Sequence, residues 1–311
     1  MDFLRHLSVR VSKATELRDW SESRIIRVEG ERDGRAVTLY CKLARSGGDR
    51  EHAVYRFAAD RPGFPAPRAD FAKDGSGEWL VIDEAAGTRL ADFRGSGHYL
   101  TAGRALASFH ARAAGWLRDA GARPFMSAVE DLNALLPGLA TVALAETRRR
   151  AGEGIHAGID LPLLGEVEEL TRGVWTKLVQ EVRHLPVTLI HGDCHNGNLF
   201  LSDDGRLTLI DWSSAALGPG LVDLVALLDV AERMGDPTDP PAEVRRAYID
   251  ALPSNWSALY SDSARAWNLV RIVHALLELR WFAATGEDFG ERANRELMML
   301  DMALDHFRHR Q

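Results

Sequence analysis

The first part of the chain alternates apolar and polar residues in short runs, which is typical of β-strands. The segment IIRVEGERDGRAVTLYCKLA holds two such runs, joined by Asp33-Gly34, a dipeptide that favours a hairpin turn. Residues 49–60 follow with helical spacing, and two further strand-like runs, ADFAKDG and GEWLVIDEA, flank a glycine-rich turn. We therefore expect residues 1–87 to form a small antiparallel β-sheet that carries one helix, with a connector near residues 84–88.

After Gly87 the apolar residues recur mostly at helical intervals. The exception is a segment of three short strand-like runs, VTLI, NLFL and LTLI, between residues 187 and 210. The expected helices cover residues 101–120, most of 127–183 with a break near 152–158, 221–234, 241–252, 263–284 and 291–308. The pattern predicts an α+β chain with two lobes, an N-lobe of residues 1–87 and a larger, mostly helical C-lobe of residues 88–311.

Polar residues gather around the short strands of the C-lobe. Asp204-Gly205 separates NLFL from LTLI, so these two runs are expected to form a hairpin. Such a hairpin brings Asp193 and Asn198, which precede it, to the same end as Asp211, which follows it. Two carboxylates and an amide oxygen are hard ligands suited to Mg²⁺. These groups serve phosphoryl transfer, in which positioning and charge neutralisation do most of the catalysis.

The N-lobe supplies a second charged group. Lys42 lies in the strand LYCKLA among apolar neighbours, where a cation needs a partner, and Glu51 of the next helix is a suitable one. A Lys–Glu pair of this kind holds an ammonium where it contacts nucleotide phosphates. Residues 20–24, WSESR, are expected in the turn between the first two strands, where Ser21 and Ser23 offer hydrogen-bond donors to phosphate.

Composition and charge restrict the kinds of partner and compartment that are expected for the protein. The formal net charge is −7 and the isoelectric point is about 5.9, which argues against nucleic acid as the main partner. No apolar run reaches about 18 residues, so no membrane span is expected. Cys41 and Cys194 are the two cysteines, which favours a reducing cytoplasm over a disulfide framework. We expect a cytoplasmic monomer or homodimer.

Several segments together resemble the aminoglycoside phosphotransferase and choline kinase-like family. HGDCHNGNL (191–199) resembles its Brenner-type motif, and LIDW (209–212) resembles its metal-binding segment. LASFHA (106–111) is similar to the family's helix ending in His, GPGLVDLVALL (218–228) to the stretch after the metal site, and LVIDEAAG (80–87) to the hinge. The resemblance spans nearly the whole chain and implies a bilobal protein-kinase-like fold.

The resemblance also implies roles for individual residues. Asp193 would be the base, or the orienting group, for the substrate hydroxyl, and Asn198 and Asp211 would hold Mg²⁺. Lys42 would contact the α- and β-phosphates, with Glu51 fixing its position. The backbone of Asp83 and Ala85 would meet adenine at the hinge. ATP is the expected donor. Because WSES lacks the glycines that many relatives carry in the phosphate loop, GTP stays open as an alternative.

The sequence indicates the residues that bind the acceptor less specifically than it indicates the catalytic and metal-binding ones. The candidate acceptor residues Trp267, Arg271, His274 and Glu278 lie, together with Trp281, near one face of the helix expected at 263–284. In relatives the late helices border the acceptor pocket. The other interpretation is that the tryptophans belong to the core and the charges are solvated. His195 either lines the substrate pocket or caps its own turn.

The expected function is ATP- and Mg²⁺-dependent transfer of the γ-phosphate to a hydroxyl of a small molecule. The acceptor would be an antibiotic of aminoglycoside, nucleoside or peptide type, or a metabolite such as choline, a sugar or a homoserine-like alcohol. A different hypothesis takes His191, Asp193 and His195 as an H-x-D-x-H metal cluster of a hydrolase. A nucleotide-binding module without turnover is the third.

Overall fold

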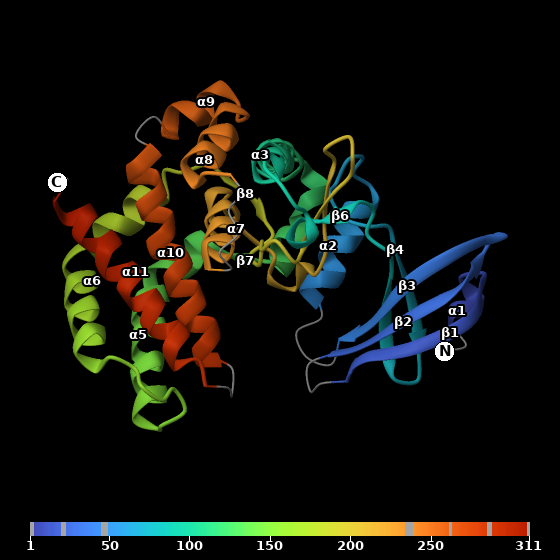
Figure 1. The fold of residues 1–311 in the computed structure, drawn as a ribbon, viewed down its shortest axis with the longest axis horizontal. Coiled ribbons are helices and arrows are strands. Elements are labelled where there is room, and N and C mark those ends of the chain that lie inside the picture. The colour runs from blue at the N-terminus through green and yellow to red at the C-terminus, as the bar shows by residue number, and fades with distance from the viewer. Residues whose placement is uncertain are drawn as a thin grey trace.

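The computed structural model describes residues 3–19, 23–44, 49–233, 239–260, 263–284 and 288–309. A β-sheet lies at one end of the molecule and a group of helices at the other, with short strands and loops between them (Figure 1). The expected class, an antiparallel sheet at the N-terminus followed by a mostly helical part, is confirmed. The boundary at residue 87 stays a prediction.

The N-terminal sheet has five antiparallel strands in the order β1-β2-β3-β5-β4. Its strands are β1 (Val9–Asp19), β2 (Ser23–Arg32), β3 (Arg35–Ala44), β4 (Ala69–Asp74) and β5 (Gly77–Asp83). Arg32 pairs with Arg35, so the turn between β2 and β3 consists of Asp33 and Gly34 alone. Both turn residues have positive φ, 54° and 77°, as a two-residue hairpin turn requires. The predicted hairpin is confirmed.

Two helices flank this sheet. The short α1 (Phe3–His6) covers one face, where Leu4 packs with strand residues such as Leu39, Cys41 and Val81. The longer α2 (Asp49–Ala59) lies between the sheet and the helical part of the molecule (Figure 1). Because side chains alternate along a strand, Lys42 lies on the face opposite to Cys41 and is directed toward α2. The alternation therefore places the charged residue on the side of the second lobe.

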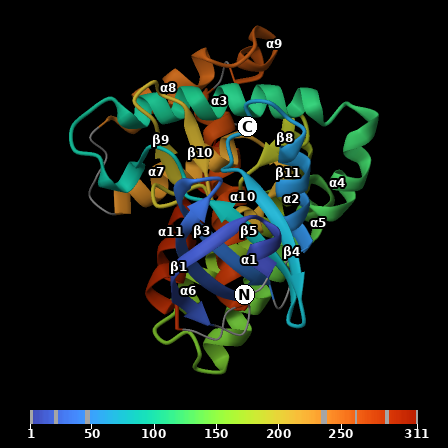
Figure 2. The ribbon, with the colours of Figure 1, turned by 90° about the vertical axis from the view of Figure 1, so that its right-hand side faces the viewer.

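The C-terminal part is built from helices and two three-stranded sheets, of order β10-β9-β6 and β7-β11-β8. The helices are α3 (His98–Trp116), α4 (Arg123–Ala128), α5 (Leu132–Gly152), α6 (Leu161–Val182), α7 (Leu221–Arg233), α8 (Pro241–Asp250), α9 (Ser254–Ser257), α10 (Ser263–Ala284) and α11 (Gly290–His309). The strands are β6 (Thr88–Arg89), β7 (Glu130–Asp131), β8 (Val187–Ile190), β9 (Leu199–Leu201), β10 (Leu207–Leu209) and β11 (Ala216–Pro219). Figure 2, turned by 90°, shows α3 running above the N-terminal sheet.

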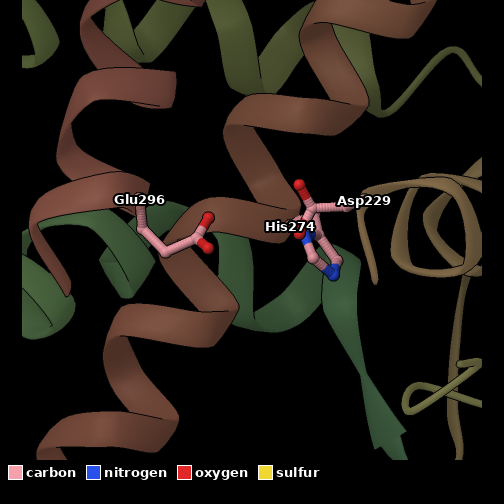
Figure 3. A group of neighbouring side chains, drawn as sticks. All are labelled: Asp229, His274 and Glu296. Carbon is pink, nitrogen blue, oxygen red and sulfur yellow. The ribbon is translucent and has the colours of Figure 1, made fainter. Parts of the chain in front are cut away.

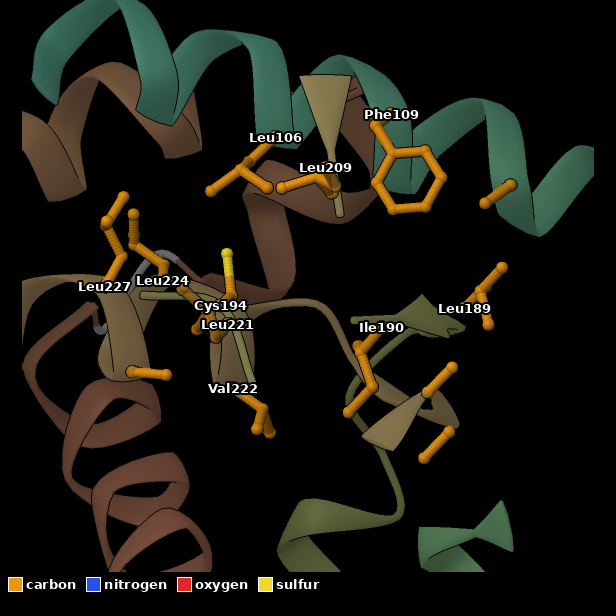
Figure 4. Close-up of a cluster of buried hydrophobic side chains, with 14 of the residues drawn as sticks. Leu106, Phe109, Leu189, Ile190, Cys194, Leu209, Leu221, Val222, Leu224 and Leu227 are labelled. Carbon is orange, nitrogen blue, oxygen red and sulfur yellow. The ribbon is translucent and has the colours of Figure 1, made fainter. Parts of the chain in front are cut away.

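The apolar core of the C-terminal part has two regions. One connects the inner face of the sheet through α3 to the short strands and α7, and Figure 4 shows part of it, with Leu106 and Phe109 of α3 near Leu209 and Leu221. The other lies among α5, α6, α10 and α11. The polar loop 191–198 and residue 211 are thus held by strands and a helix whose apolar sides are buried.

Both cysteines are buried and reduced. Burial raises the pKa of the Cys41 thiol to about 12, and burial together with Asp223 and Asp193 raises the pKa of Cys194 well above its usual value. Both side chains act as small apolar fillers.

The structure differs from the sequence expectations in its short elements. The strand VTLI pairs with β11, and NLFL pairs with β6 in addition to its expected partner β10. The pattern gave no sign of α1, α4, α9, β6, β7 or β11, which span two to six residues each and are too short for periodicity to detect. None of the described helices is both long enough and apolar enough to cross a membrane.

Candidate active site

The hairpin of β9 and β10 positions two polar residues. Leu199 pairs with Leu209, and beyond this pair the N–H of Ile210 donates to the carbonyl of Asn198 at 3.1 Å. At the other end Gly205, with φ of 76°, closes the turn. Asn198 and the residue after Ile210, Asp211, therefore leave the hairpin at the same end, as the sequence predicts.

Asp211 carries the negative charge at this end. Its backbone has φ of 61° and begins the 3₁₀ turn η3 (Trp212–Ser214), a left-handed conformation that Asp tolerates better than most residues. Oδ1 accepts hydrogen bonds from Lys42 Nζ and from Ser213 Oγ, each at 2.9 Å. Burial acts to raise the pKa of Asp211, but the Lys42 ammonium outweighs it, so the pKa is lowered and the carboxylate is ionised.

Lys42 of β3 bridges two acidic residues from different parts of the chain. Its Nζ lies 2.7 Å from Glu51 Oε2 of α2 and 2.9 Å from Asp211 Oδ1. Burial acts to lower the pKa of Lys42, yet the two carboxylates raise it overall, so the ammonium stays charged. The Glu51 side chain is 5% exposed, and this burial raises its pKa against the opposing effect of Lys42. The predicted Lys–Glu partnership is present in the geometry, with Asp211 as an additional partner.

Asp193 lies in the loop before the hairpin, with half of its side chain exposed. The amide of Asn198 donates from Nδ2 to the Asp193 carbonyl at 3.0 Å and to Asp193 Oδ2 at 3.2 Å. These bonds fix which side of the amide carries the nitrogen, and they direct Asn198 Oδ1 away from Asp193. Asp193 is therefore open to solvent while its loop is held by Asn198.

A buried carboxylate anchors the same loop from below. Asp223, the third residue of α7, accepts the backbone N–H of His191 at 2.7 Å and that of Gly192 at 2.9 Å. It also lies 3.2 Å from Nε2 of His110 in α3, whose Nδ1 is 2.8 Å from the Tyr248 hydroxyl. Burial acts to raise the pKa of Asp223, but His110 and His191 with its backbone bond lower it overall.

The sequence resemblance singled out the segments that contain His110 and Asp223, but it did not find Tyr248. A tyrosine in a helix gives no local sign of a distant histidine partner, so only the packing of α8 against α3 reveals this contact.

Glycine is required at the anchored turn. Gly192 has φ of 79°, and a Cβ there would lie 2.1 Å from the Ser214 carbonyl oxygen. Any other residue would therefore push the turn that carries Asp193 away from the segment that follows Asp211.

The histidines of the loop have structural partners. His191 is fully buried, donates from Nε2 to the Ile210 carbonyl at 2.8 Å and accepts the Asp193 N–H at Nδ1. His195 accepts the Gly197 N–H at Nδ1, at 3.0 Å, and its Nε2 is 3.8 Å from Asp193 Oδ2. Since both nitrogens of His191 are engaged, the geometry does not support an H-x-D-x-H metal cluster of a hydrolase.

The donors at the end of the hairpin fit a hard divalent cation. Asp211 is an ionised carboxylate, and the amide of Asn198 keeps its oxygen directed away from Asp193. Oxygen donors of this kind, without thiolate or free imidazole, suit Mg²⁺.

The residues expected to meet the nucleotide differ in where they lie and in which of their groups are already hydrogen-bonded. Ser21 lies outside the described residues, whereas Ser23 is the buried first residue of β2, opposite Ala44, and not part of the turn. The Asp83 carboxylate is engaged by Arg32 at 2.7 and 2.8 Å, and its N–H donates to the Arg68 carbonyl at 2.9 Å. The N–H of Asp83 is thus already used, which leaves its carbonyl and the backbone of Ala85 as hinge candidates.

The four candidate acceptor residues of α10 divide between two places. Trp267 and Arg271 line a pocket of about 130 Å³ between α7, α8 and α10. The pocket is also lined by Asp229, Glu232 and Arg245, besides apolar residues, and the Arg245 guanidinium lies 5.4 Å from the Trp267 ring centroid. His274 is 7% exposed and lies beside Asp229 and Glu296, and Glu278 is a charged neighbour of Glu296.

The sequence model that represents the phosphotransferase enzyme family matches residues 13–260 of this chain. No curated protein matches the sequence significantly.

Solved structures with a similar fold cover nearly the whole chain. The aminoglycoside phosphotransferase APH(2'')-Ib with bound ADP has 13% sequence identity and a TM-score of 0.61, and 97% of each chain is covered. Choline kinase LicA from Streptococcus pneumoniae has 14% identity and a TM-score of 0.60, with 98% of this chain and 96% of that chain covered. The ethanolamine kinase of Plasmodium vivax has 11% identity and a TM-score of 0.63, with 97% and 85% covered.

These structures share the protein-kinase-like fold, and the family model extends from the first strand into the helical part of the chain. The chain therefore belongs to the phosphotransferase enzyme family.

Proposed function

We propose that this protein transfers the γ-phosphate of ATP to a hydroxyl group of a small molecule, with Mg²⁺ bound by Asn198 and Asp211. The observation that carries the proposal is the position of Lys42, whose ammonium lies between Glu51 and Asp211 at 2.7 and 2.9 Å. These three residues come from a strand, a helix and the end of a hairpin. Their convergence places a fixed cation beside an ionised metal-ligand candidate, which is the arrangement that triphosphate binding requires.

Each residue has a separate part in this proposal. Lys42 binds phosphate oxygens, and Glu51 keeps its ammonium in place from the interior of the N-terminal lobe. The metal neutralises phosphate charge when it is bound. The nucleotides in similar structures, ADP in APH(2'')-Ib and AMP-PNP in APH(4)-Ia, support a nucleotide donor.

Asp193 is proposed to accept or orient the proton of the attacking hydroxyl. Its carboxylate is half exposed, so an acceptor can reach it, while Asn198 and the Asp223-anchored backbone hold the loop in place. A fixed carboxylate within hydrogen-bond reach of the hydroxyl supplies the positioning on which phosphoryl transfer depends.

For the acceptor, an antibiotic remains the first candidate class, since solved relatives include aminoglycoside and macrolide phosphotransferases. One observation favours the alternative, a metabolite alcohol. The pocket at Trp267 contains two guanidinium groups, Arg245 and Arg271, and burial together with Arg271 lowers the pKa of Arg245. The same pocket holds the carboxylates of Asp229 and Glu232, so its guanidinium groups offer partners to a carboxylate and its acids offer partners to an ammonium, which suits a zwitterionic, homoserine-like amino alcohol.

The catalytic proposal is tested with Asp193→Ala and the matched control Asp203→Ala, an exposed Asp in the turn of the hairpin. We expect Asp193→Ala to abolish ATP-dependent phosphorylation while ATP affinity, measured by calorimetry, stays within about threefold of the wild type. Full turnover in Asp193→Ala would refute the assigned role.

The acceptor class is tested by measuring ADP release with aminoglycosides, choline, sugars and homoserine. Turnover with homoserine, together with a raised KM for homoserine and an unchanged KM for ATP in Arg271→Gln, would support the metabolite alternative. Turnover restricted to an antibiotic would rule it out.

A further inference from the structure

Three helices of the C-terminal part each direct one metal-ligating side chain to a common point. Asp229 comes from α7, His274 from α10 and Glu296 from α11, and Figure 3 shows the Glu296 carboxylate extending toward the other two. One ligand atom of each residue lies within 4.8 Å of the other two. Among the described residues this is the one group of three or more His, Cys, Asp or Glu side chains that meets so closely.

The polar atoms of this cluster are poorly satisfied. Glu296 and His274 are 2% and 7% exposed, and within the described part of the chain the imidazole makes no hydrogen bond. Asp229 Oδ2 is buried and also lacks a hydrogen bond there. Arg233 is the nearest countercharge, with Nη1 at 3.1 Å from Asp229 Oδ2 and 3.6 Å from Glu296 Oε1. One guanidinium thus serves both carboxylates, and the imidazole beside them leaves a nitrogen donor open to a further ligand.

We propose that Asp229, His274 and Glu296 form a binding site for one first-row transition-metal dication, with Zn²⁺ the best match. One imidazole and two carboxylates are a donor set that zinc accepts, with a water molecule as the fourth ligand. Zinc bonds of about 2.0–2.2 Å place neighbouring donors roughly 3.4 Å apart. The carboxylates therefore need to move inward by about an ångström or more, which their side-chain torsions allow.

One further observation fits a cation at this point. Asp229 also lines the pocket of about 130 Å³ at Trp267, so one of the three ligands is reached from that pocket.

This site is distinct from the one proposed for Mg²⁺. It includes an imidazole, which zinc favours and Mg²⁺ does not, and none of its ligands belongs to the hairpin or the loop at 191–198. A bound ion would join α7, α10 and α11, and α7 also carries Asp223, the anchor of that loop. The site would therefore stabilise the helical part whatever the acceptor of the enzyme is.

The test uses the full-length protein after treatment with a chelator. Zn²⁺ affinity is measured by competition with a chromophoric chelator, and Co²⁺ substitution is followed by visible absorption. We expect about one high-affinity ion per chain in the wild type, and at least about tenfold weaker binding in both His274→Gln and Glu296→Gln. His306→Gln, another histidine of the last two helices, and Asp211→Asn should keep the affinity and the Co²⁺ spectrum.

Circular dichroism establishes that each variant is folded, and Asp229→Asn replaces either variant that is not. A rise in Tm on adding Zn²⁺ is expected in the wild type and should be absent in the ligand variants. Wild-type protein that binds no Zn²⁺, or binding that persists in the ligand variants, would overturn the assignment. Loss of binding only in Asp211→Asn would also overturn it, because the ion would then occupy the nucleotide site.

Discussion

The imidazole of His110 and the carboxylate of Asp223 lie 3.2 Å apart, and neither side chain is exposed. The contact joins α3 to α7 across 113 residues of sequence. Asp223 also accepts two backbone N–H groups of the loop that leads to Asp193, so one buried carboxylate links the helical core to the candidate catalytic residue.

This relationship predicts an acid-sensitive contribution to stability. The pKa of Asp223 is lowered in the folded protein, so its contribution is present above the unfolded carboxyl pKa of about 4 and is lost as the pH falls through the lower folded value. Asp223→Asn should lower the free energy of unfolding by about 3–5 kcal/mol near neutral pH. Urea unfolding at several pH values should show this difference shrinking below about pH 4. The control Asp203→Asn, at an exposed position, should change the free energy of unfolding by less than about 0.5 kcal/mol. If Asp223→Asn lost the same free energy at every pH, Asp223 would not be ionised in the folded protein.

Variants of Lys42 and Glu51 should separate the effect of this pair on stability from its effect on activity. Lys42→Met leaves the buried Glu51 carboxylate without its ammonium, and we expect a loss of about 3–5 kcal/mol in unfolding free energy. Adding Glu51→Gln to that variant removes the charge of the more deeply buried of the two carboxylates that lost the ammonium, and should restore most of the stability, since the Asp211 side chain is 38% exposed. Phosphotransfer should stay at least about a hundredfold below the wild type in both, because the phosphate contact is missing. Chemical unfolding and steady-state kinetics on the same preparations measure the two effects, and recovery of activity in the double variant would exclude Lys42 from phosphate binding.

A remote carboxylate caps the helix α3. Asp239 accepts the N–H groups of Gly97, Tyr99 and Leu100 at 2.6, 3.0 and 3.3 Å, although about 140 residues separate it from them. Asp239→Ala should therefore cost about 2 kcal/mol or slightly more, at the upper end of the range for helix caps. Asp119→Ala is the matched control, because Asp119 occupies a cap position without a side-chain cap bond. Equal Tm values for the two variants would show that the Asp239 contacts contribute nothing.

Glycine at position 192 is required by geometry. Gly192→Ala places a methyl group 2.1 Å from the Ser214 carbonyl oxygen and a Cβ on a backbone with positive φ, so the 192–193 turn must shift. We expect kcat to fall by about a hundredfold, since small displacements of a positioned group have effects of that size. Gly173→Ala, in α6 with no atom near the new Cβ, should instead stabilise the protein by about 0.5–1 kcal/mol. Unchanged kinetics in Gly192→Ala would mean that the turn tolerates the shift.

The elements that the sequence predicts well are those with strong local signals. The turns at Asp33-Gly34 and Asp204-Gly205 require positive φ, and both form the expected hairpins. The helix predicted over 263–284 is present over those residues. The grouping of Asp193, Asn198 and Asp211 follows from one such hairpin, so a local signal in the sequence is enough to predict it.

The contacts that the sequence does not reveal connect distant segments. Asp239 lies in what resembles an acidic, solvated run, yet it caps α3. Asp83 was expected at the hinge, but its carboxylate also pairs with Arg32, 51 residues earlier. The approach of Asp229, His274 and Glu296 depends on how α7, α10 and α11 pack, which no helical periodicity specifies.

The burial of both thiols has a practical use. Because Cys41 and Cys194 are inaccessible and their pKa values are raised, a maleimide dye has no reactive native target in the folded protein. A single cysteine introduced at the exposed Asp203 would then carry the fluorophore alone, at the tip of the β9–β10 hairpin. Rearrangements of that hairpin on adding nucleotide become observable in the otherwise natural sequence, without first building a cysteine-free background.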